Sequence, residues 1–281
     1  MSGEFDGKRV LVTGGSMGIG REVADELARR GASVLIAARN LTAVTSGAAE
    51  LPGRRHVGIA LDVSDPDAWP QAMAEIDAGG ELHGLVSAAG VLGPIGALET
   101  VDPREFADTI AVNLVGTMLA LRFAVPRLRR SRGRAVTFSG GGATAPLPRY
   151  DAYAASKAAV VRLTENVAAA YPEISVNCVA PGFVATRMHE QTLRAGAEAA
   201  GHEYFERTRA QLGSGGFPAG EAAELVCFLL SDAVGGISGR LLSSAWDPWR
   251  DERFRKRLHE EPALGTLRRI DGQFFTRTAD S

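Results

Sequence analysis

The segment RVLVTGGSMGIG, residues 9–20, joins a short apolar run to a turn of the form Gly14-x-x-x-Gly18-x-Gly20. The apolar run predicts a buried strand, and the residues behind the turn have the apolar spacing of a helix. Glycines at such a junction allow a tight turn and let the backbone approach a pyrophosphate at the helix N-terminus. The segment therefore predicts a dinucleotide site, although a purely structural glycine turn shows the same pattern.

Strand and helix patterns alternate along the rest of the chain. Further strands are predicted at 33–38, 57–61, 82–87, 135–138, 174–179 and 239–243. Helices are predicted at 65–78, 103–129, 186–212 and 218–230, with one more that begins near residue 151. Because strands that alternate with helices pair in parallel, we expect one α/β domain. Its sheet of about seven strands should carry helices on both faces.

The composition is that of an ordinary soluble globular protein, with 45% apolar and 23% charged residues and a net charge of −2. This charge balance gives no sign of a basic surface for nucleic acid. No apolar run approaches the roughly 20 residues that a membrane helix needs. The two cysteines, Cys178 and Cys227, lie in apolar segments, which indicates buried thiols in a reducing compartment. The five histidines lack metal-ligand spacing. We expect a cytoplasmic protein with no nucleic-acid, membrane or metal partner.

Chemistry is predicted at the start of the helix near residue 151, where Tyr153 and Lys157 stand four apart and share one face. An ammonium beside a phenol favours the phenolate and lowers the tyrosine pKa from about 10. A tyrosine tuned in this way can give a proton to a carbonyl oxygen or take one from an alcohol. The pair alone is weak evidence, because the same spacing occurs on many helices by chance.

The end of the second predicted strand bears on the choice of cofactor. An acidic residue there would bond the adenosine ribose, whereas an arginine accommodates a 2′-phosphate. The chain has Ala38 followed by Arg39, which favours NADP(H) over NAD(H), unless Arg39 is simply a solvated surface residue. After the third predicted strand, Asp62 is a candidate for bonding the adenine amino group, with a turn cap as the alternative.

The ordered set of residues 13–20, Asp62-Val63, Asn113, Tyr153-x-x-x-Lys157 and Pro181-Gly182 resembles the short-chain dehydrogenase/reductase family. The resemblance covers residues 8–242. It implies a Rossmann-type, doubly wound parallel sheet in residues 1–245, with residues 246–281 as a C-terminal extension. It also implies NAD(P)-dependent oxidation of an alcohol or reduction of a carbonyl in a small-molecule substrate.

The resemblance also implies roles for individual residues. Tyr153 would be the proton donor or acceptor, Lys157 would hold the nicotinamide ribose, and Asn113 would anchor a water in a proton relay. Ser139 would position the substrate oxygen. The implied cofactor-binding residues are Gly14, Ser16, Met17, Gly18, Ile19, Gly20, Arg39, Asp62, Val63, Ala89, Gly90, Tyr153, Lys157, Pro181, Gly182, Val184 and Thr186.

Within residues 181–186, which would close on the nicotinamide, the Val184 backbone would meet the carboxamide and Thr186 the phosphates. A plain turn at Pro181-Gly182 and a helix cap at Thr186 are alternatives. Ordinary hydrogen bonding is an alternative for Asn113, which lies in an otherwise apolar helical run.

The chain departs from the family pattern at two places. After the fourth predicted strand it has Ser87-Ala88-Ala89-Gly90, where the family usually has asparagine in the motif. The family's catalytic serine commonly precedes the tyrosine by thirteen residues, and Gly140 stands there. Ser139 is the preferred replacement and Thr144 a second. The missing serine also motivates a rival hypothesis, a non-catalytic NADP(H)-binding sensor or interaction module.

Several segments are expected to determine specificity and assembly. Loops at 91–98 and 143–150 and a predicted flap at 187–216 would set the substrate, whose identity does not follow from the sequence. By the family resemblance, the apolar helices around Asn113 and Tyr153 imply a homodimer or homotetramer. The C-terminal extension should dock on its own domain or on a neighbouring subunit, because it carries Trp246, Trp249, Phe254, Leu258, Phe274 and Phe275.

Overall fold

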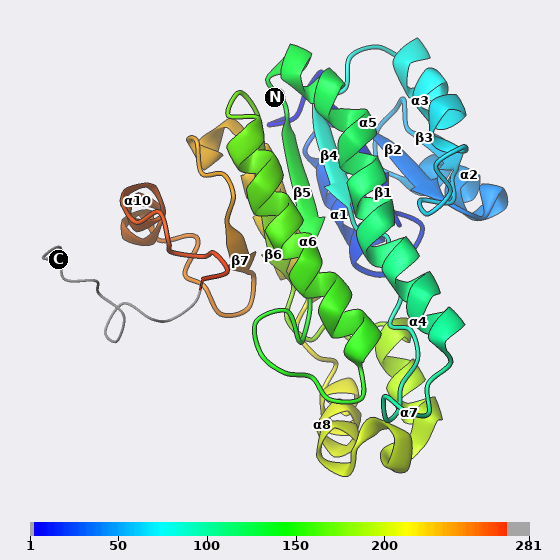
Figure 1. The fold of residues 1–281 in the computed structure, drawn as a ribbon. Coiled ribbons are helices and arrows are strands. Elements are labelled where there is room, and N and C mark those ends of the chain that lie inside the picture. The colour runs from blue at the N-terminus through cyan, green and yellow to red at the C-terminus, as the bar shows by residue number, and fades with distance from the viewer. Residues whose placement is uncertain (1–2, 269–281) are drawn as a thin grey trace, which may run out of the picture.

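Seven strands pair in parallel to form one sheet at the centre of the protein (Figure 1). The structure is a computed structural model that describes residues 3–268. The spatial order is β3-β2-β1-β4-β5-β6-β7, which reverses direction between β1 and β4 and so leaves a crevice at their carboxyl ends. The strands are β1 (Arg9–Thr13), β2 (Ser33–Ala38), β3 (Val57–Ala60), β4 (Gly84–Ser87), β5 (Arg134–Phe138), β6 (Ser175–Ala180) and β7 (Leu241–Ser243).

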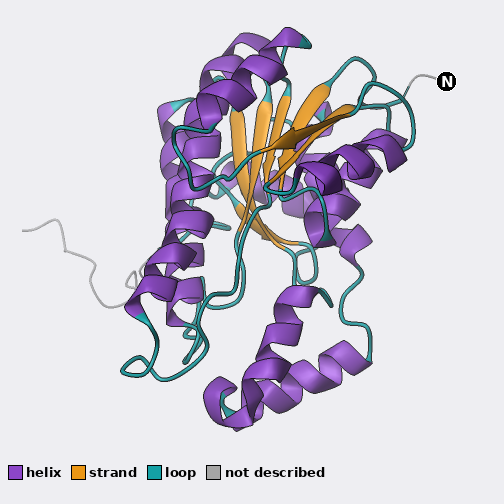
Figure 2. Cartoon of the chain, turned by 90° about the vertical axis from the view of Figure 1, so that its right-hand side faces the viewer, coloured by secondary structure: helices purple, strands orange, loops and turns teal. Residues whose placement is uncertain are grey.

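Helices cover both faces of the sheet, as Figure 2 shows from the side. One face packs on α1 (Gly18–Arg29), α2 (Leu41–Glu50) and α9 (Ala219–Leu230). The other face packs on α3 (Trp69–Ala78), α5 (Gly116–Ser131) and α6 (Asp151–Ala170). A short helix, α4 (Pro103–Ile110), leads into α5 through the π-helical turn η1 (Ala111–Val115). The seven-stranded parallel sheet with helices on both faces is therefore confirmed.

The remaining helices lie at the ends of the sheet. The predicted flap folds as α7 (Arg187–Ala200) and α8 (His202–Gly213) beyond the carboxyl ends of the strands, and α10 (Glu252–Glu260) lies beside β7 (Figure 1). The flap was expected as one helix, but Gly201 has a φ of 82° and separates the two. A 3-10 turn, η2 (Asp232–Val234), follows α9.

Two helices were not predicted, and a third begins later than expected. Helix α2 was missed because its sequence, LTAVTSGAAE, is rich in small and β-branched residues and shows little periodicity. Helix α10 was also missed. The helix expected from residue 65 starts only at Trp69, because Asp62 and Asp65 accept hydrogen bonds from the backbone N–H two residues on and hold the chain in turns.

Residues 103–131 are long and apolar enough to cross a membrane by length and composition, with a mean hydropathy of 1.5 over an 18-residue window. Half of that window is buried inside the protein. A core helix passes the same test, and here α5 packs on the sheet through Leu119, Leu121 and Leu128. The stretch is therefore weak evidence for a membrane segment.

The C-terminal extension packs on its own chain as far as residue 268. Trp249 is buried against Phe228 of α9, with ring centroids 5.6 Å apart, and Leu258 of α10 is buried in the same cluster. The N–H of Leu241 in β7 donates to the Gly265 carbonyl at 2.7 Å. Trp246 differs from the expectation, because it is 73% exposed. Phe274 and Phe275 lie outside the described residues.

Replacing Trp249 with alanine should lower the free energy of unfolding by about 3 kcal/mol, the lower end of the range for large aromatic residues. We choose the lower end because the buried indole Nε1 has no hydrogen-bond partner among residues 3–268, so its removal relieves a desolvation cost. Urea unfolding measures the change. Trp246→Ala is the matched control, for which a change within about 0.5 kcal/mol is expected at an exposed position. Equal losses in both variants would contradict the docking described above.

Candidate active site

The glycine turn after β1 forms a backbone cradle at the start of α1. Gly14 has a φ of 70°, and a Cβ there would lie 2.7 Å from the Ala89 backbone, so only glycine fits. A Cβ on Gly20 would overlap the Gly14 carbonyl, which brings α1 close to the strand. The Met17 side chain at the N-cap makes no capping hydrogen bond. The first N–H groups of α1 are therefore available to a phosphate, and the cradle fits the predicted dinucleotide.

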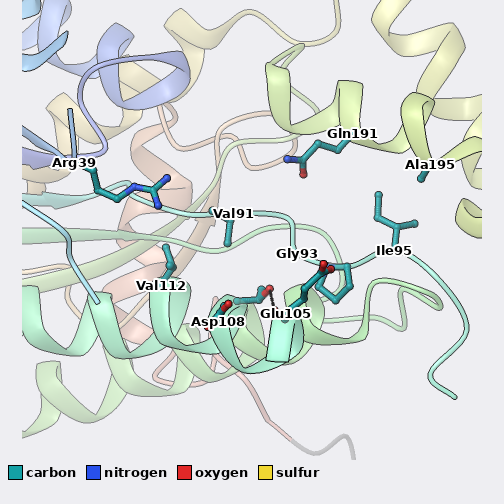
Figure 3. Close-up of a pocket in the computed structure, with 11 residues that line it drawn as sticks. Arg39, Val91, Gly93, Ile95, Glu105, Asp108, Val112, Gln191 and Ala195 are labelled. Atoms are coloured by element: carbon teal, nitrogen blue, oxygen red, sulfur yellow. Dashed lines mark hydrogen bonds between the residues drawn. The ribbon is translucent and has the colours of Figure 1, made fainter. Parts of the chain in front are cut away.

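A cavity of about 480 Å³ runs from the end of β2 to the flap (Figure 3). Figure 3 shows Arg39 reaching into it toward Val91 and Val112, and Gln191 of α7 reaching in from the opposite side. Arg39 is exposed. The cavity therefore joins the predicted adenosine end of the cofactor site to the flap.

Asp62 caps a turn next to this cavity. Its Oδ1 accepts from the Ser64 hydroxyl at 2.6 Å and from the Ser64 N–H at 2.9 Å. These bonds, with the charge of Arg39, hold the pKa of Asp62 below its ordinary value. Val63 packs against Gly116, where a Cβ would lie 2.7 Å from a Val63 methyl. The turn-cap alternative for Asp62 is observed, and bonding to adenine stays a prediction.

Asn113 lies inside the π-helical turn η1 and is fully buried. Its Oδ1 accepts from the Val91 N–H at 2.8 Å, and its Nδ2 donates to the Val91 carbonyl at 2.9 Å and to the Ser156 hydroxyl at 3.0 Å. Both amide hydrogens are used. Asn113 thus ties the loop after β4 to α6, which is the ordinary hydrogen-bonding role, while the water relay stays a prediction.

Lys157 is 6% exposed beneath the Tyr153 ring, with its ammonium 5.7 Å from the ring centroid. Its Nζ donates to the Phe138 carbonyl at 3.1 Å. A Cβ on Gly90 would lie 3.4 Å from this Nζ and 3.2 Å from Asn113 Oδ1, so three of the predicted site residues meet at one point. Burial lowers the pKa of Lys157 to about 8.

The pKa of Tyr153 differs from the expectation. The charge of Lys157 was expected to lower it, but burial dominates and raises it. The burial comes from residues distant in the sequence. We define the Tyr153 cluster as the buried Leu92, Tyr150 and Ala200 together with the partly buried side chains that pack against them: Ile95, Leu147, Tyr153, Met188, Tyr204 and Phe205.

The structure places Gly140, not Ser139, beside the Tyr153 hydroxyl. A Cβ on Gly140 would overlap that hydroxyl and lie 2.9 Å from the ring carbon that bears it. Ser139 is 3% exposed, and its Oγ has no hydrogen-bond partner within residues 3–268. Thr144, the second replacement considered, lies exposed in the following loop. Neither predicted substitute for the missing serine is therefore bonded to the phenol.

Residues 181–186 run beside the glycine cradle, since a Cβ on Gly18 would be 3.7 Å from the Thr186 methyl. Thr186 occupies the N-cap position of α7, but its hydroxyl pairs with His189 Nδ1 at 3.4 Å instead of capping the helix. Pro181 and Val184 are buried, and Val184 bridges to Gly216 at the end of the flap. This segment thus links the cradle to the flap.

Two residues near the site were missed by sequence reasoning. Ser156 accepts from Asn113 and donates to the Tyr153 carbonyl at 2.7 Å. Its position directly before Lys157 was the available signal. Tyr204 of α8 packs into the Tyr153 cluster, with its ring centroid 4.8 Å from that of Tyr150. No motif marks Tyr204, because its contacts depend on how the flap folds back.

Comparison with known proteins identifies the family. A family model described as short chain dehydrogenase matches residues 8–196. A protein of Sesamum indicum named 11-beta-hydroxysteroid dehydrogenase A is 34% identical over 66% of this chain, and the match spans 55% of that protein's length. A Xanthobacter autotrophicus protein named inactive 2-(S)-hydroxypropyl-CoM dehydrogenase 2 is 37% identical over 75% of this chain and 92% of its own.

A solved structure described as the KRED1-Pglu enzyme superposes with a TM-score of 0.77 at 26% identity. The superposition covers 84% of this chain and all of that one. The Rossmann-like sheet, the glycine cradle and the Tyr153–Lys157 pair thus occur together with a family match over most of the chain. The family consists of oxidoreductases that act on hydroxyl or carbonyl groups with a nicotinamide cofactor. The chain belongs to the short-chain dehydrogenase/reductase family.

Proposed function

We propose that the protein is an NADPH-dependent reductase of ketones, with Tyr153 as general acid. The observation that carries the proposal is the position of the phenol. Its ring packs in the Tyr153 cluster, its hydroxyl lies beside Gly140 just after β5, and the Lys157 ammonium is 5.7 Å from the ring centroid. We infer that this phenol serves the crevice at the carboxyl ends of the strands, where ligands bind in open α/β sheets.

The chain's own residues account for binding and for proton transfer. The cradle at the start of α1 holds the diphosphate, and Lys157 holds the nicotinamide ribose with the N–H groups that Phe138 does not use. When bound, the reduced nicotinamide supplies the hydride to the carbonyl carbon. Tyr153 gives its proton to the carbonyl oxygen, Lys157 stabilises the resulting phenolate, and solvent restores the proton.

The raised pKa of Tyr153 bears on the direction of the reaction. Burial keeps the phenol protonated at neutral pH, and the protonated form is the one that donates to a carbonyl oxygen. Oxidation of an alcohol would instead require the phenolate as base. The raised pKa thus supports the role of Tyr153 as the acid in reduction at neutral pH.

The Tyr153 cluster supports an apolar body for the substrate. Its members Leu92, Leu147, Met188 and Phe205 are apolar, and none of these side chains can satisfy the hydroxyls of a sugar. The Sesamum relative is named for a hydroxysteroid, a rigid apolar ring system. We therefore propose ring-containing apolar ketones as the substrate class.

NADPH consumption, followed by absorbance, tests the proposal with a panel of cyclohexanone, tetralone and fructose. We expect turnover with tetralone to exceed that with cyclohexanone and to be absent with fructose. Turnover of fructose alone would contradict the apolar substrate class. If NADPH binds but no ketone in a broadened panel is reduced, the enzyme proposal fails.

Arg39→Asp should weaken NADPH binding by about 10- to 100-fold, which corresponds to losing one charge-assisted contact with the 2′-phosphate. NADH should bind at least as tightly as to the wild type, because it lacks that phosphate and an acidic residue at the end of β2 can bond its adenosine ribose. Fluorescence titration measures both dissociation constants. Arg54→Asp, at an exposed position before β3, makes the same change in net charge and serves as the control. Equal weakening of NADPH and NADH would contradict a phosphate role for Arg39.

A second candidate function is a non-catalytic NADP(H)-binding module. Gly140 lacks the hydroxyl expected of the family, and the Xanthobacter relative is named as inactive. This candidate shares the cofactor cradle and differs only in turnover. The ketone panel therefore separates the two candidates.

We also propose a cytoplasmic homodimer or homotetramer. The exposed Met118 on α5 and the partly buried Val112 and Val115 beside it support an apolar contact on this face. Light scattering of the purified chain tests the assembly. A monomer at micromolar concentration would contradict it.

A further inference from the structure

The site lacks one hydrogen-bond donor that carbonyl reduction needs. Charge develops on the ketone oxygen in the transition state, and a preorganised donor besides the general acid stabilises it. Position 140 carries no side chain, and with Tyr153 as it lies a Cβ there would overlap the phenol hydroxyl. A second side-chain donor must therefore come from elsewhere in the fold.

The other hydroxyl groups of this region are enclosed, exposed in a loop or already hydrogen-bonded. Ser139 Oγ is fully enclosed, and Thr144 points from an exposed loop. Tyr150 is 0% exposed, and its hydroxyl is already used as a donor to Thr192 at 3.1 Å. Ser156 is fully buried and donates to the Tyr153 carbonyl. None of these four hydroxyls is free to face a substrate above the phenol.

Tyr204 remains, and its placement suits the task. It lies on α8 within the Tyr153 cluster and is only partly buried. Burial raises the pKa of Tyr204, and the Arg207 guanidinium, 4.9 Å from its ring centroid, opposes that rise. Tyr153 and Tyr204 pack against the same three buried residues, Leu92, Tyr150 and Ala200, which places the two phenols in one cluster.

We propose that Tyr204 donates the second hydrogen bond to the substrate carbonyl oxygen, in place of the serine that position 140 lacks. The inference rests on the proposed reductase function. In the reaction Tyr204 keeps its proton throughout, while the proton transferred to oxygen comes from Tyr153.

Tyr204 lies on α8 of the flap, which is flanked by glycines with positive φ. Helices α7 and α8 meet at Gly201, with a φ of 82°, and the loop that follows α8 contains Gly215 and Gly216, with φ of 83° and 63°. Such glycines absorb the backbone changes of a moving segment. The donor is therefore in place only when the flap packs on Tyr153, so closure over the substrate and completion of the site occur together.

The experiment compares the wild type with Tyr204→Phe, which removes the hydroxyl and keeps the ring. Steady-state reduction of tetralone by NADPH is measured with the NADPH dissociation constant. We expect kcat/KM to fall by about 10- to 100-fold, which approaches the loss seen when one oxyanion donor is removed. The NADPH dissociation constant should stay within twofold of that of the wild type. The primary isotope effect with deuterated NADPH should rise, because the chemical step becomes slower. A packing defect alone would not raise it.

Two further variants complete the test. Tyr171→Phe, at the far end of α6, is the matched control and should behave as the wild type. Ser139→Ala addresses the rival hydroxyl. If Tyr204→Phe stays within twofold of the wild type, or if the loss appears in Ser139→Ala instead, the assignment is overturned. A wild type that reduces no ketone refutes the proposed function itself, and this outcome is visible before any variant is made.

Discussion

Tyr153→Phe is expected to lower kcat for ketone reduction by about 10³- to 10⁴-fold, the upper part of the range for general acid catalysis. The variant removes the phenol hydroxyl that is the proposed proton donor and keeps the ring that packs in the Tyr153 cluster. Stopped-flow or steady-state NADPH consumption measures the loss. Cofactor affinity should stay within about twofold, since the cradle at Gly14 and Gly18 is untouched.

Tyr171→Phe again provides the control, because it makes the same chemical change at the end of α6, where the ring lies against Arg129. Residual activity within tenfold of the wild type in Tyr153→Phe would rule out Tyr153 as the general acid. Loss of NADPH binding together with activity would show instead that the variant damaged the cofactor site.

Lys157→Met is expected to lower kcat/KM by about 10³-fold through two effects. The ammonium no longer stabilises the Tyr153 phenolate, and the nicotinamide ribose loses its partner, so NADPH should also bind more weakly. Methionine fills a similar volume, which keeps the buried position packed. Steady-state kinetics and cofactor titration together check both effects. Unchanged NADPH affinity would contradict the ribose contact.

Lys157 also predicts a specific pH dependence of stability. Burial lowers its pKa from 10.5 to about 8, so between these values the unfolded chain binds a proton that the folded chain does not. The contribution of Lys157 to the free energy of unfolding therefore rises with pH across this window. Urea unfolding at several pH values should show that the wild type gains stability relative to Lys157→Met from pH 8 to pH 10. A parallel pH dependence of the two proteins would contradict the lowered pKa.

Most of the sheet was predictable because its signals are local. The bounds of β1 and β2 agree with the predicted 9–13 and 33–38, since each is an apolar run ended by glycine or polar residues. Helix α2 escaped prediction because its sequence shows little apolar periodicity, and the short α10 has only Phe254 and Leu258 as apolar residues. They are held by tertiary contacts such as those of Val44 and Leu258 with the core.

The site was predictable in part for the same reason. The four-residue spacing of Tyr153 and Lys157 places both on one face of any helix, and the structure keeps them together. The direction of the Tyr153 pKa was wrong, because it depends on burial by Tyr204 and its neighbours on the flap. Sequence spacing carries no information on that burial.

By itself the sequence determined the order of the strands and of most helices, the glycine cradle and the tyrosine–lysine pair. These features follow from the backbone freedom of glycine and from periodicities of a few residues. Only the tertiary structure decided that Gly140 lies beside the Tyr153 hydroxyl, that Ser139 is enclosed, and that Tyr204 of the flap packs in the same cluster as Tyr153. The physical reason is that burial and the approach of hydroxyl groups arise between segments distant in the chain, which meet only when the flap packs against α6.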